Sequence, residues 1–122
     1  MQVFKTRAFA RWARREGLGD DLLAFAVAEM EAGLIDARLG GSVCKKRIAL
    51  DGRGKRGSTR TIVAYLQGEK AFFVYGFAKS ERSNITPNEL QALKLLAKTL
   101  LAYSPAEIAD ALRAGALIRL EE

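Results

Sequence analysis

The apolar residues of this chain recur with a helical period in some segments and alternate with polar residues in others. Residues 2–5 predict a short first strand. Helical spacing then predicts one helix that follows Thr6 as N-cap and reaches about residue 16, and a second over residues 21–32 with Asp20 as N-cap. A glycine follows each helix and ends it. The two helices are expected to form a hairpin with one apolar side.

Three segments rich in β-branched and aromatic residues predict strands over residues 43–50, 59–67 and 70–77. Their connections are short, and Gly68-Glu69 has the composition of a two-residue hairpin turn. Strands joined by so few residues pair with their neighbours in opposite directions. An antiparallel meander is therefore expected.

Two helix-start signals mark the C-terminal third of the chain. Thr86 and Ser104 are each followed by a proline at the first helical position and a glutamate at the third, which makes each segment a capping box. Helices are expected from there to about residue 102 and to near Gly115, with a short terminal strand over residues 117–121. The predicted fold class is α+β: a single domain in which an N-terminal helical hairpin packs on a small antiparallel meander, followed by C-terminal helices. The domain is expected to span residues 1–122.

The chain contains no histidine and a single cysteine, Cys44, among its 122 residues. Mechanisms built on Ser-His-Asp or Cys-His pairs, and zinc sites of cysteine and histidine, are therefore excluded for the chain acting alone. Cys44 is expected to be a buried small residue on a strand. No segment has the length of an uncharged membrane span, and basic residues interrupt the segment where a signal peptide needs an apolar run. A cytoplasmic protein is expected.

Positive charge is concentrated in one third of the chain. Residues 42–82 hold ten Lys or Arg and three Asp or Glu, whereas the whole chain has a net charge of +6. Phosphate is the natural counter-charge for such a cluster, which favours a nucleic-acid partner. The centre of the cluster, residues 51–57, combines glycines with basic residues but lacks the spacing of a nucleotide-binding P-loop.

The meander is expected to bring basic residues from separate segments to one end of the sheet. These residues are Lys45, Lys46, Arg47, Arg60, Lys79 and Arg82. Strand alternation places Lys46 on one face and Lys45 and Arg47 on the other. Together with aromatic side chains available for base stacking, the arrangement predicts a phosphate-binding site for RNA.

The run from Lys46 to Arg60, with its Gly-Arg-Gly-Lys-Arg-Gly loop, and the phenylalanine-rich run from Ala71 to Arg82 resemble the HigB-type branch of the RelE/ParE toxin superfamily. The resemblance covers most of the chain. It implies a RelE-like fold and the toxin of a type II toxin–antitoxin module, which cleaves messenger RNA in the decoding site of the small ribosomal subunit. The implied reaction is attack of a 2′-hydroxyl on the neighbouring phosphate, with no metal and no cofactor. The implied partners are a cognate antitoxin, often a helix-turn-helix protein from the adjacent gene, and the ribosome with its messenger RNA.

The resemblance also implies roles for individual residues. The expected catalytic residues are Lys46, Arg60, Lys79 and Arg82. The residues expected to bind RNA or the ribosome are Lys45, Arg47, Arg53, Lys55, Arg56, Tyr65 and Phe77. Related toxins often place a tyrosine or histidine after the last basic segment, where this chain has residues 83–86 (Ser-Asn-Ile-Thr) and Thr86 is committed to helix capping. Lys46 is then the candidate proton acceptor, because neighbouring cations favour loss of its proton.

Two other functions are compatible with this scaffold. One is a ParE-like inhibitor of DNA gyrase, and the other is a non-catalytic nucleic-acid-binding regulatory module. Cleavage of messenger RNA in a translation extract separates the endonuclease from both. The antitoxin is expected either to cover the basic site or to dock on the helical hairpin of residues 6–33.

Overall fold

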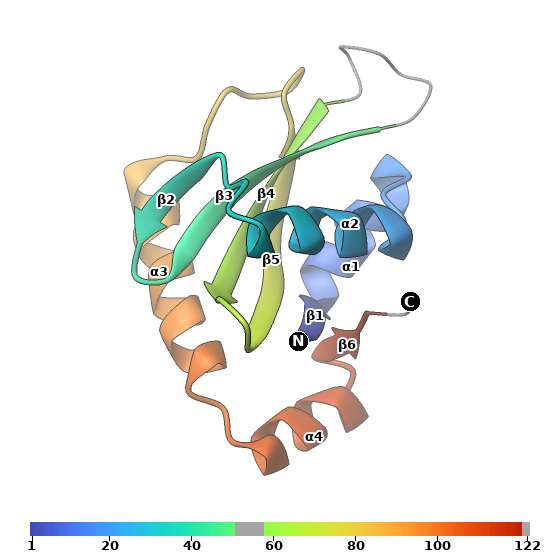
Figure 1. The fold of residues 1–122 in the computed structure, drawn as a ribbon, viewed down its shortest axis with the longest axis vertical. Coiled ribbons are helices and arrows are strands. Elements are labelled where there is room, and N and C mark those ends of the chain that lie inside the picture. Colours follow the sequence, from blue (N-terminus) through green and yellow to red (C-terminus); the bar gives the residue numbers. More distant parts are fainter. Residues whose placement is uncertain (51–57, 121–122) are drawn as a thin grey trace.

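The computed structural model describes residues 1–50 and 58–120. Within them the chain forms a six-stranded sheet in the order β2-β3-β4-β5-β1-β6, with helices on both faces (Figure 1). The helices are α1 (Arg7–Glu16), α2 (Asp20–Glu31), α3 (Pro87–Leu101) and α4 (Pro105–Arg113). The strands are β1 (Gln2–Thr6), β2 (Ala37–Gly40), β3 (Val43–Ala49), β4 (Ser58–Leu66), β5 (Lys70–Ala78) and β6 (Leu117–Arg119). This architecture confirms the predicted α+β fold class.

Strands β3, β4 and β5 form the expected antiparallel meander. Strand β1 pairs with β5 in the parallel direction, and β6 pairs antiparallel with β1, so the first and last strands lie side by side (Figure 1). Edge strand β2 was not predicted from the sequence. The β4–β5 connection is also longer than the predicted two residues: Leu66 pairs with Lys70, which leaves three residues in the turn, and Gly68 adopts a φ of 76° there.

The helix starts follow their sequence signals with one exception. Thr6 caps α1 by accepting a hydrogen bond from the N–H of Phe9 at 3.2 Å, and the capping boxes of α3 and α4 both form. The predicted cap at Asp20 is wrong, because Gly19 is the N-cap of α2 and makes no side-chain hydrogen bond. Asp20 is instead the first helical residue, and its carboxylate accepts from Lys5 Nζ at 2.7 Å.

Each face of the sheet has its own apolar core. Helices α1 and α2 pack on one face through residues such as Phe9, Leu23 and Met30, which meet Phe73. Helices α3 and α4 cover the other face, where Ala97, Leu100 and Ile108 join a second cluster from the strands. Cys44 is buried on the α1–α2 side, as expected, and burial raises the pKa of its thiol.

Candidate nucleic-acid interface

Two arginines face each other at the end of the meander that lies away from the β4–β5 turn. Arg47 in β3 pairs directly with Arg60 in β4, and Arg60 pairs with Phe77 in β5. Directly paired residues project from the same face with Cβ atoms ~4.5–5.5 Å apart, and like charges in such a pair destabilise a sheet. Lys45 lies two residues from Arg47 and so projects from this face too. The arrangement therefore favours an anionic ligand between the cations.

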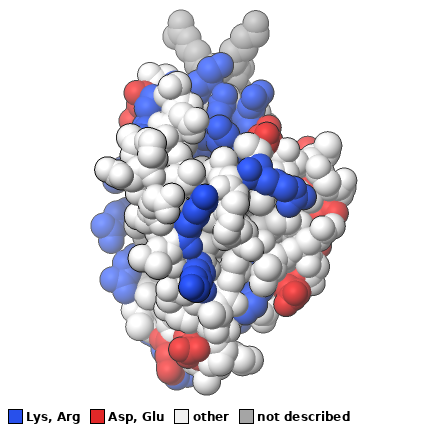
Figure 2. All heavy atoms as spheres, turned by 90° about the vertical axis from the view of Figure 1, so that its left-hand side faces the viewer, with Lys and Arg blue, Asp and Glu red and all other residues white. Residues whose placement is uncertain are grey.

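Lys45, Arg47 and Arg60 project from the face of the sheet that α3 covers nearer the β4–β5 turn. Val43 of β3 and Ile62 of β4 have the same alternation as the two arginines, and both belong to the core beneath α3. Figure 2 shows this side of the molecule, with Lys and Arg side chains gathered at the upper end, where β3 ends and β4 begins. Arg60 is also fixed in position, because its Nη1 donates to Ser58 Oγ at 2.7 Å.

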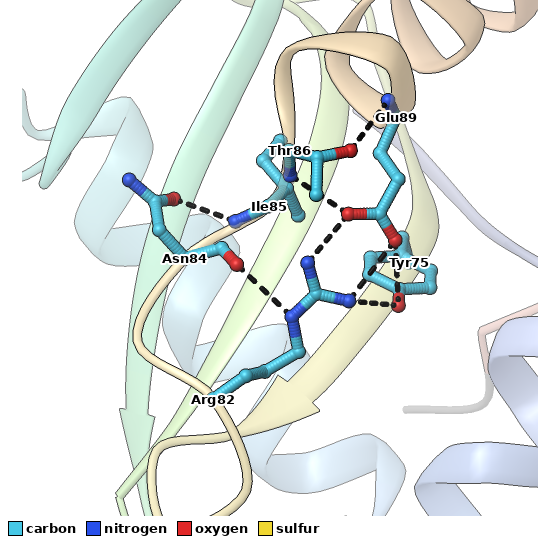
Figure 3. Close-up of polar contacts among 6 residues, drawn as sticks. All are labelled: Tyr75, Arg82, Asn84, Ile85, Thr86 and Glu89. Carbon is cyan, nitrogen blue, oxygen red and sulfur yellow. Dashed lines mark hydrogen bonds and ion pairs between the residues drawn. The ribbon is translucent and has the colours of Figure 1, made fainter.

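Arg82 follows β5 and is held by several partners at once (Figure 3). Its guanidinium carbon lies 5.5 Å from the centre of the Phe77 ring. Its Nε donates to the carbonyl of Asn84 at 2.9 Å, and its Nη1 donates to the Tyr75 hydroxyl at 3.2 Å and to Glu89 Oε2 at 3.0 Å. Its Nη2 donates to Glu89 Oε1, which completes a bidentate pair. Arg82 therefore joins the aromatic end of β5 to the start of α3.

Glu89 serves the helix and the arginine together. Its Oε1 accepts the N–H of Thr86 at 2.7 Å, which closes the capping box, while both of its oxygens face Arg82. The hydrogen bond from Arg82 and then that from the Thr86 N–H lower the pKa of Glu89 to about 2. The same pairing raises the pKa of Arg82. The Tyr75 hydroxyl donates to Glu89 Oε2 at 3.4 Å, so the phenol proton points toward a carboxylate and its oxygen accepts from a guanidinium.

Lys46, an expected catalytic residue, lies on the opposite face of the sheet from Arg60. Its side chain is buried, with 5% of the residue exposed. Its Nζ donates to the carbonyl of Leu34 at 2.9 Å and pairs with Glu29 at 3.2 Å, beside the last turns of α2. A cation at a helix C-terminus is favoured by the helix dipole. The structure therefore does not bring Lys46 together with Arg60 and Arg82.

Tyr65, an expected RNA contact, is buried on the α1–α2 side of the sheet near the β4–β5 turn. Its hydroxyl donates to Glu31, whose carboxylate also accepts the N–H of Gly68 at 3.0 Å. Burial and this carboxylate raise the pKa of Tyr65. The residue thus packs in the core, away from the arginine cluster.

The remaining expected residues divide into two groups. Lys79 is exposed directly after β5, and its backbone N–H donates to the carbonyl of Ser58 at 3.4 Å, which places its backbone beside the start of β4. The loop residues Arg53, Lys55 and Arg56 lie outside the described residues.

Two residues of this site, Tyr75 and Glu89, are not among the site residues expected from the sequence. Tyr75 alternates in phase with Phe77, and their ring centres are 6.2 Å apart, so its spacing on β5 was the available signal. For Glu89 the sequence predicts a capping role alone. Its pairing with Arg82 depends on how α3 starts beside β5, and sequence spacing does not report that contact.

A family model described as the RelE toxin of the RelE / RelB toxin–antitoxin system matches residues 1–120 of the chain. The chain belongs to the RelE toxin family. A search of curated protein sequences finds no match. The family match makes the chain the toxin of a toxin–antitoxin pair and implies a cognate antitoxin. The narrower assignment to the HigB-type branch stays a prediction. In the described part of this RelE-family toxin, no helix combines the length and apolar character that crossing a membrane requires.

Proposed function

We propose that this toxin is an endoribonuclease that cleaves messenger RNA on the ribosome. The observation that supports the proposal most directly is the cross-strand pair Arg47–Arg60, with Phe77 next in register and Arg82 over the Phe77 ring. Three guanidinium groups on one face match the phosphates of an RNA strand, whereas Phe77, expected to bind RNA, is buried at 4% exposed and supports Arg82 from beneath. Lys45 and Lys79 add positive charge at the same end of the sheet.

In the proposed reaction the 2′-oxygen of one nucleotide bonds to the adjacent phosphorus, and the bond from phosphorus to the 5′-oxygen breaks. The 2′-hydroxyl gives its proton to a water molecule, and the 5′-oxygen gains a proton from an acid of the site. Negative charge grows on the phosphate between these events, and cations fixed in advance stabilise it. Arg60 is fixed by Ser58, and Arg82 is fixed by Glu89. No metal is required by this scheme, because the arginines supply the charge.

The groups of the site take different parts in this scheme. Arg47, Arg60 and Lys79 are assigned to direct phosphate contact. Most N–H groups of Arg82 donate hydrogen bonds to protein partners. Its role is therefore to add charge and to orient the Tyr75 hydroxyl. That hydroxyl is the proton donor we assign to the 5′-oxygen: it turns from Glu89 to the leaving oxygen, and Arg82 stabilises the phenolate left behind. Lys46, on the opposite face, is assigned to holding β3 beneath α2.

The test is incubation of the purified toxin with programmed ribosomes and end-labelled messenger RNA. The proposed step leaves a 2′,3′-cyclic phosphate on one fragment and a 5′-hydroxyl on the other. Arg60→Lys keeps the charge but loses the planar pair of donors, so the cleavage rate should fall by about tenfold or more. Arg11→Lys, a matched change at an exposed residue of α1, should cleave as the parent does. Intact messenger together with inhibited gyrase supercoiling would replace this proposal with the ParE-like function.

The cognate antitoxin is proposed to dock on the α1–α2 hairpin and to cover the basic site in part. The hairpin leaves Phe25 64% exposed, and Leu34 after it is 57% exposed, so apolar surface is available there. Hydrogen exchange on the complex with the protein encoded beside the toxin gene tests this. Protection limited to residues 43–82, with the hairpin unchanged, would contradict docking on the hairpin.

A further inference from the structure

A cavity of about 420 Å³ opens between α1 and the outer part of β5. The pairing of β5 with β1 ends at Phe73, and beyond it α1 supplies the neighbouring wall. The residues that line the cavity include Phe9, Trp12, Arg15, Gly76, Glu81 and Arg82. Arg82 and Phe77 thus belong both to this cavity and to the proposed reaction site. A volume of this size lies in the range of ~300–1,000 Å³ that is usual for small-ligand sites.

The glycine at position 76 lets an aromatic ring lie against the strand. A Cβ atom at Gly76 would lie 2.2 Å from the Trp12 indole, so any other residue here would displace the ring. Phe9 supports the indole, with ring centres 5.5 Å apart. Trp12 remains half-buried. The cavity therefore has a supported aromatic surface as one of its walls.

The charged residues of the cavity favour a nucleotide as its occupant. Arg15 of α1 is exposed and brings a guanidinium group that binds phosphate, while Arg82, whose N–H groups are mostly held by protein partners, adds positive charge to the wall. Glu81 is the acid among the lining residues. Its carboxylate accepts hydrogen bonds, so it suits the amino edge of a base rather than a phosphate. An extended peptide would need a clear strand edge, but Ala8, Phe9 and Trp12 occupy the side of β5 where it would pair.

We propose that this cavity is a subsite for one ribonucleotide of the substrate, with its base against Trp12 and its phosphate at Arg15. The proposal rests on the proposed endonuclease function and extends it, because it assigns a second nucleotide position beside the Arg82 end of the reaction site. The RNA strand would then pass from the Arg47–Arg60 pair, past Arg82, to the edge of β5. Binding in the cavity would fix the direction of the strand relative to the cations.

Trp12 is the single tryptophan of the chain, so its fluorescence reports on this cavity alone. The purified toxin is titrated with a short oligoriboadenylate, without ribosomes, and excited at wavelengths where nucleotides do not absorb. We expect saturable quenching by the oligonucleotide and none by inorganic phosphate or by an acidic peptide of equal charge. Arg15→Ala should weaken the apparent affinity by about tenfold, since it removes a charge-assisted contact. Arg11→Ala removes the same charge from an exposed position on the same helix and should change the affinity by less than about twofold.

The proposal is overturned if quenching is absent, if the peptide quenches as well as the RNA, or if the two arginine variants weaken binding equally. Both arginines are exposed, so the variants should fold, and thermal unfolding verifies this. The assay is independent of the ribosome. Messenger cleavage without quenching would therefore refute the subsite and leave the endonuclease standing, whereas quenching without cleavage would refute the endonuclease and keep a nucleotide site.

Discussion

A single carboxylate, Glu89, both caps α3 and holds Arg82 in place. Its pKa is lowered from 4.5 to about 2, chiefly by the hydrogen bond from Arg82. A carboxylate with a lower pKa in the folded chain stabilises the fold above its unfolded pKa, and this contribution disappears as the pH falls through the folded pKa. We therefore expect Glu89→Gln to lower the Tm at neutral pH, and the gap to the parent to close between pH 4.5 and about pH 2.

Thermal unfolding over a series of pH values measures this gap. The amide oxygen of glutamine can still accept the Thr86 N–H, so the comparison isolates the charge. Glu107→Gln is the matched control, because Glu107 caps α4 in the same way and has no arginine partner among the described residues. The difference in Tm between Glu107→Gln and the parent should change less with pH. A gap for Glu89→Gln that stays constant down to pH 2 would show that the pairing with Arg82 adds no stability.

The hydroxyl of Tyr75 can be tested separately from its ring. Tyr75→Phe keeps the aromatic surface beside Phe77 but removes the group held by Arg82 and Glu89. If the hydroxyl protonates the 5′-oxygen, the single-turnover cleavage rate should fall by roughly a hundredfold or more. The free energy of unfolding should change by no more than about 1–1.5 kcal/mol, because a half-exposed hydrogen bond contributes little. Tyr103→Phe is the control, and parental cleavage by Tyr75→Phe would remove the hydroxyl from the mechanism.

At the scale of elements, the sequence predicts local structure well and long-range pairing poorly. Capping at Thr86 and Ser104 depends on four consecutive residues, so it is visible in the sequence and is confirmed. Asp20 was wrongly predicted as a cap because its carboxylate is used by Lys5, fifteen residues earlier in the chain. Strand β2 has four residues and forms at the edge of the sheet by pairing with β3, which no local pattern reports.

Strand β3 shows why the site could be predicted only in part. Alternation correctly separates Lys46 from Lys45 and Arg47, but both faces carry an apolar residue and a cation, so the pattern does not say which face α2 covers. The structure places α2 over Lys46. The cations on the other face are the ones that meet Arg60. The convergence on Arg60 follows from the short connections of the meander, whereas the burial of Lys46 follows from helix packing.

Lys46→Met tests the part that we assign to this residue. Methionine fills similar space, and exchanging a buried ionic group for an apolar one of similar volume is often close to neutral. Glu29 remains partly exposed and Leu34 is exposed, so neither is left buried without a partner. We expect a Tm within a few degrees of the parent and cleavage within about threefold, in contrast to a severe loss for Arg60→Met. A folded Lys46→Met protein that fails to cleave messenger RNA would show that Lys46 takes part in the reaction.

At the scale of the whole molecule, two helical layers enclose the sheet (Figure 1), and the proposed ligand site lies at the end of the meander away from the β4–β5 turn. The net charge of +6 comes from residues 42–82, and the described cations of that segment lie mostly at this end. In the proposed function, such a field attracts RNA from a distance and speeds the first encounter. Encounter and reaction would then depend on different residues: many cations contribute to the first, and a few fixed arginines to the second.

The loop cations Arg53, Lys55 and Arg56, which lie outside the described residues, are predicted from the sequence to act in this encounter. Replacing all three with alanine should weaken ribosome binding strongly and flatten its salt dependence, because each lost phosphate contact lowers the log–log slope by about 0.7–0.9. Thermal stability should stay near that of the parent. A triple variant with Arg11, Arg14 and Lys98 replaced by alanine removes the same charge from exposed helix positions and should keep most of the slope. Sedimentation with ribosomes at several salt concentrations gives both slopes, and an unchanged slope for the loop variant would exclude the loop from ribosome binding.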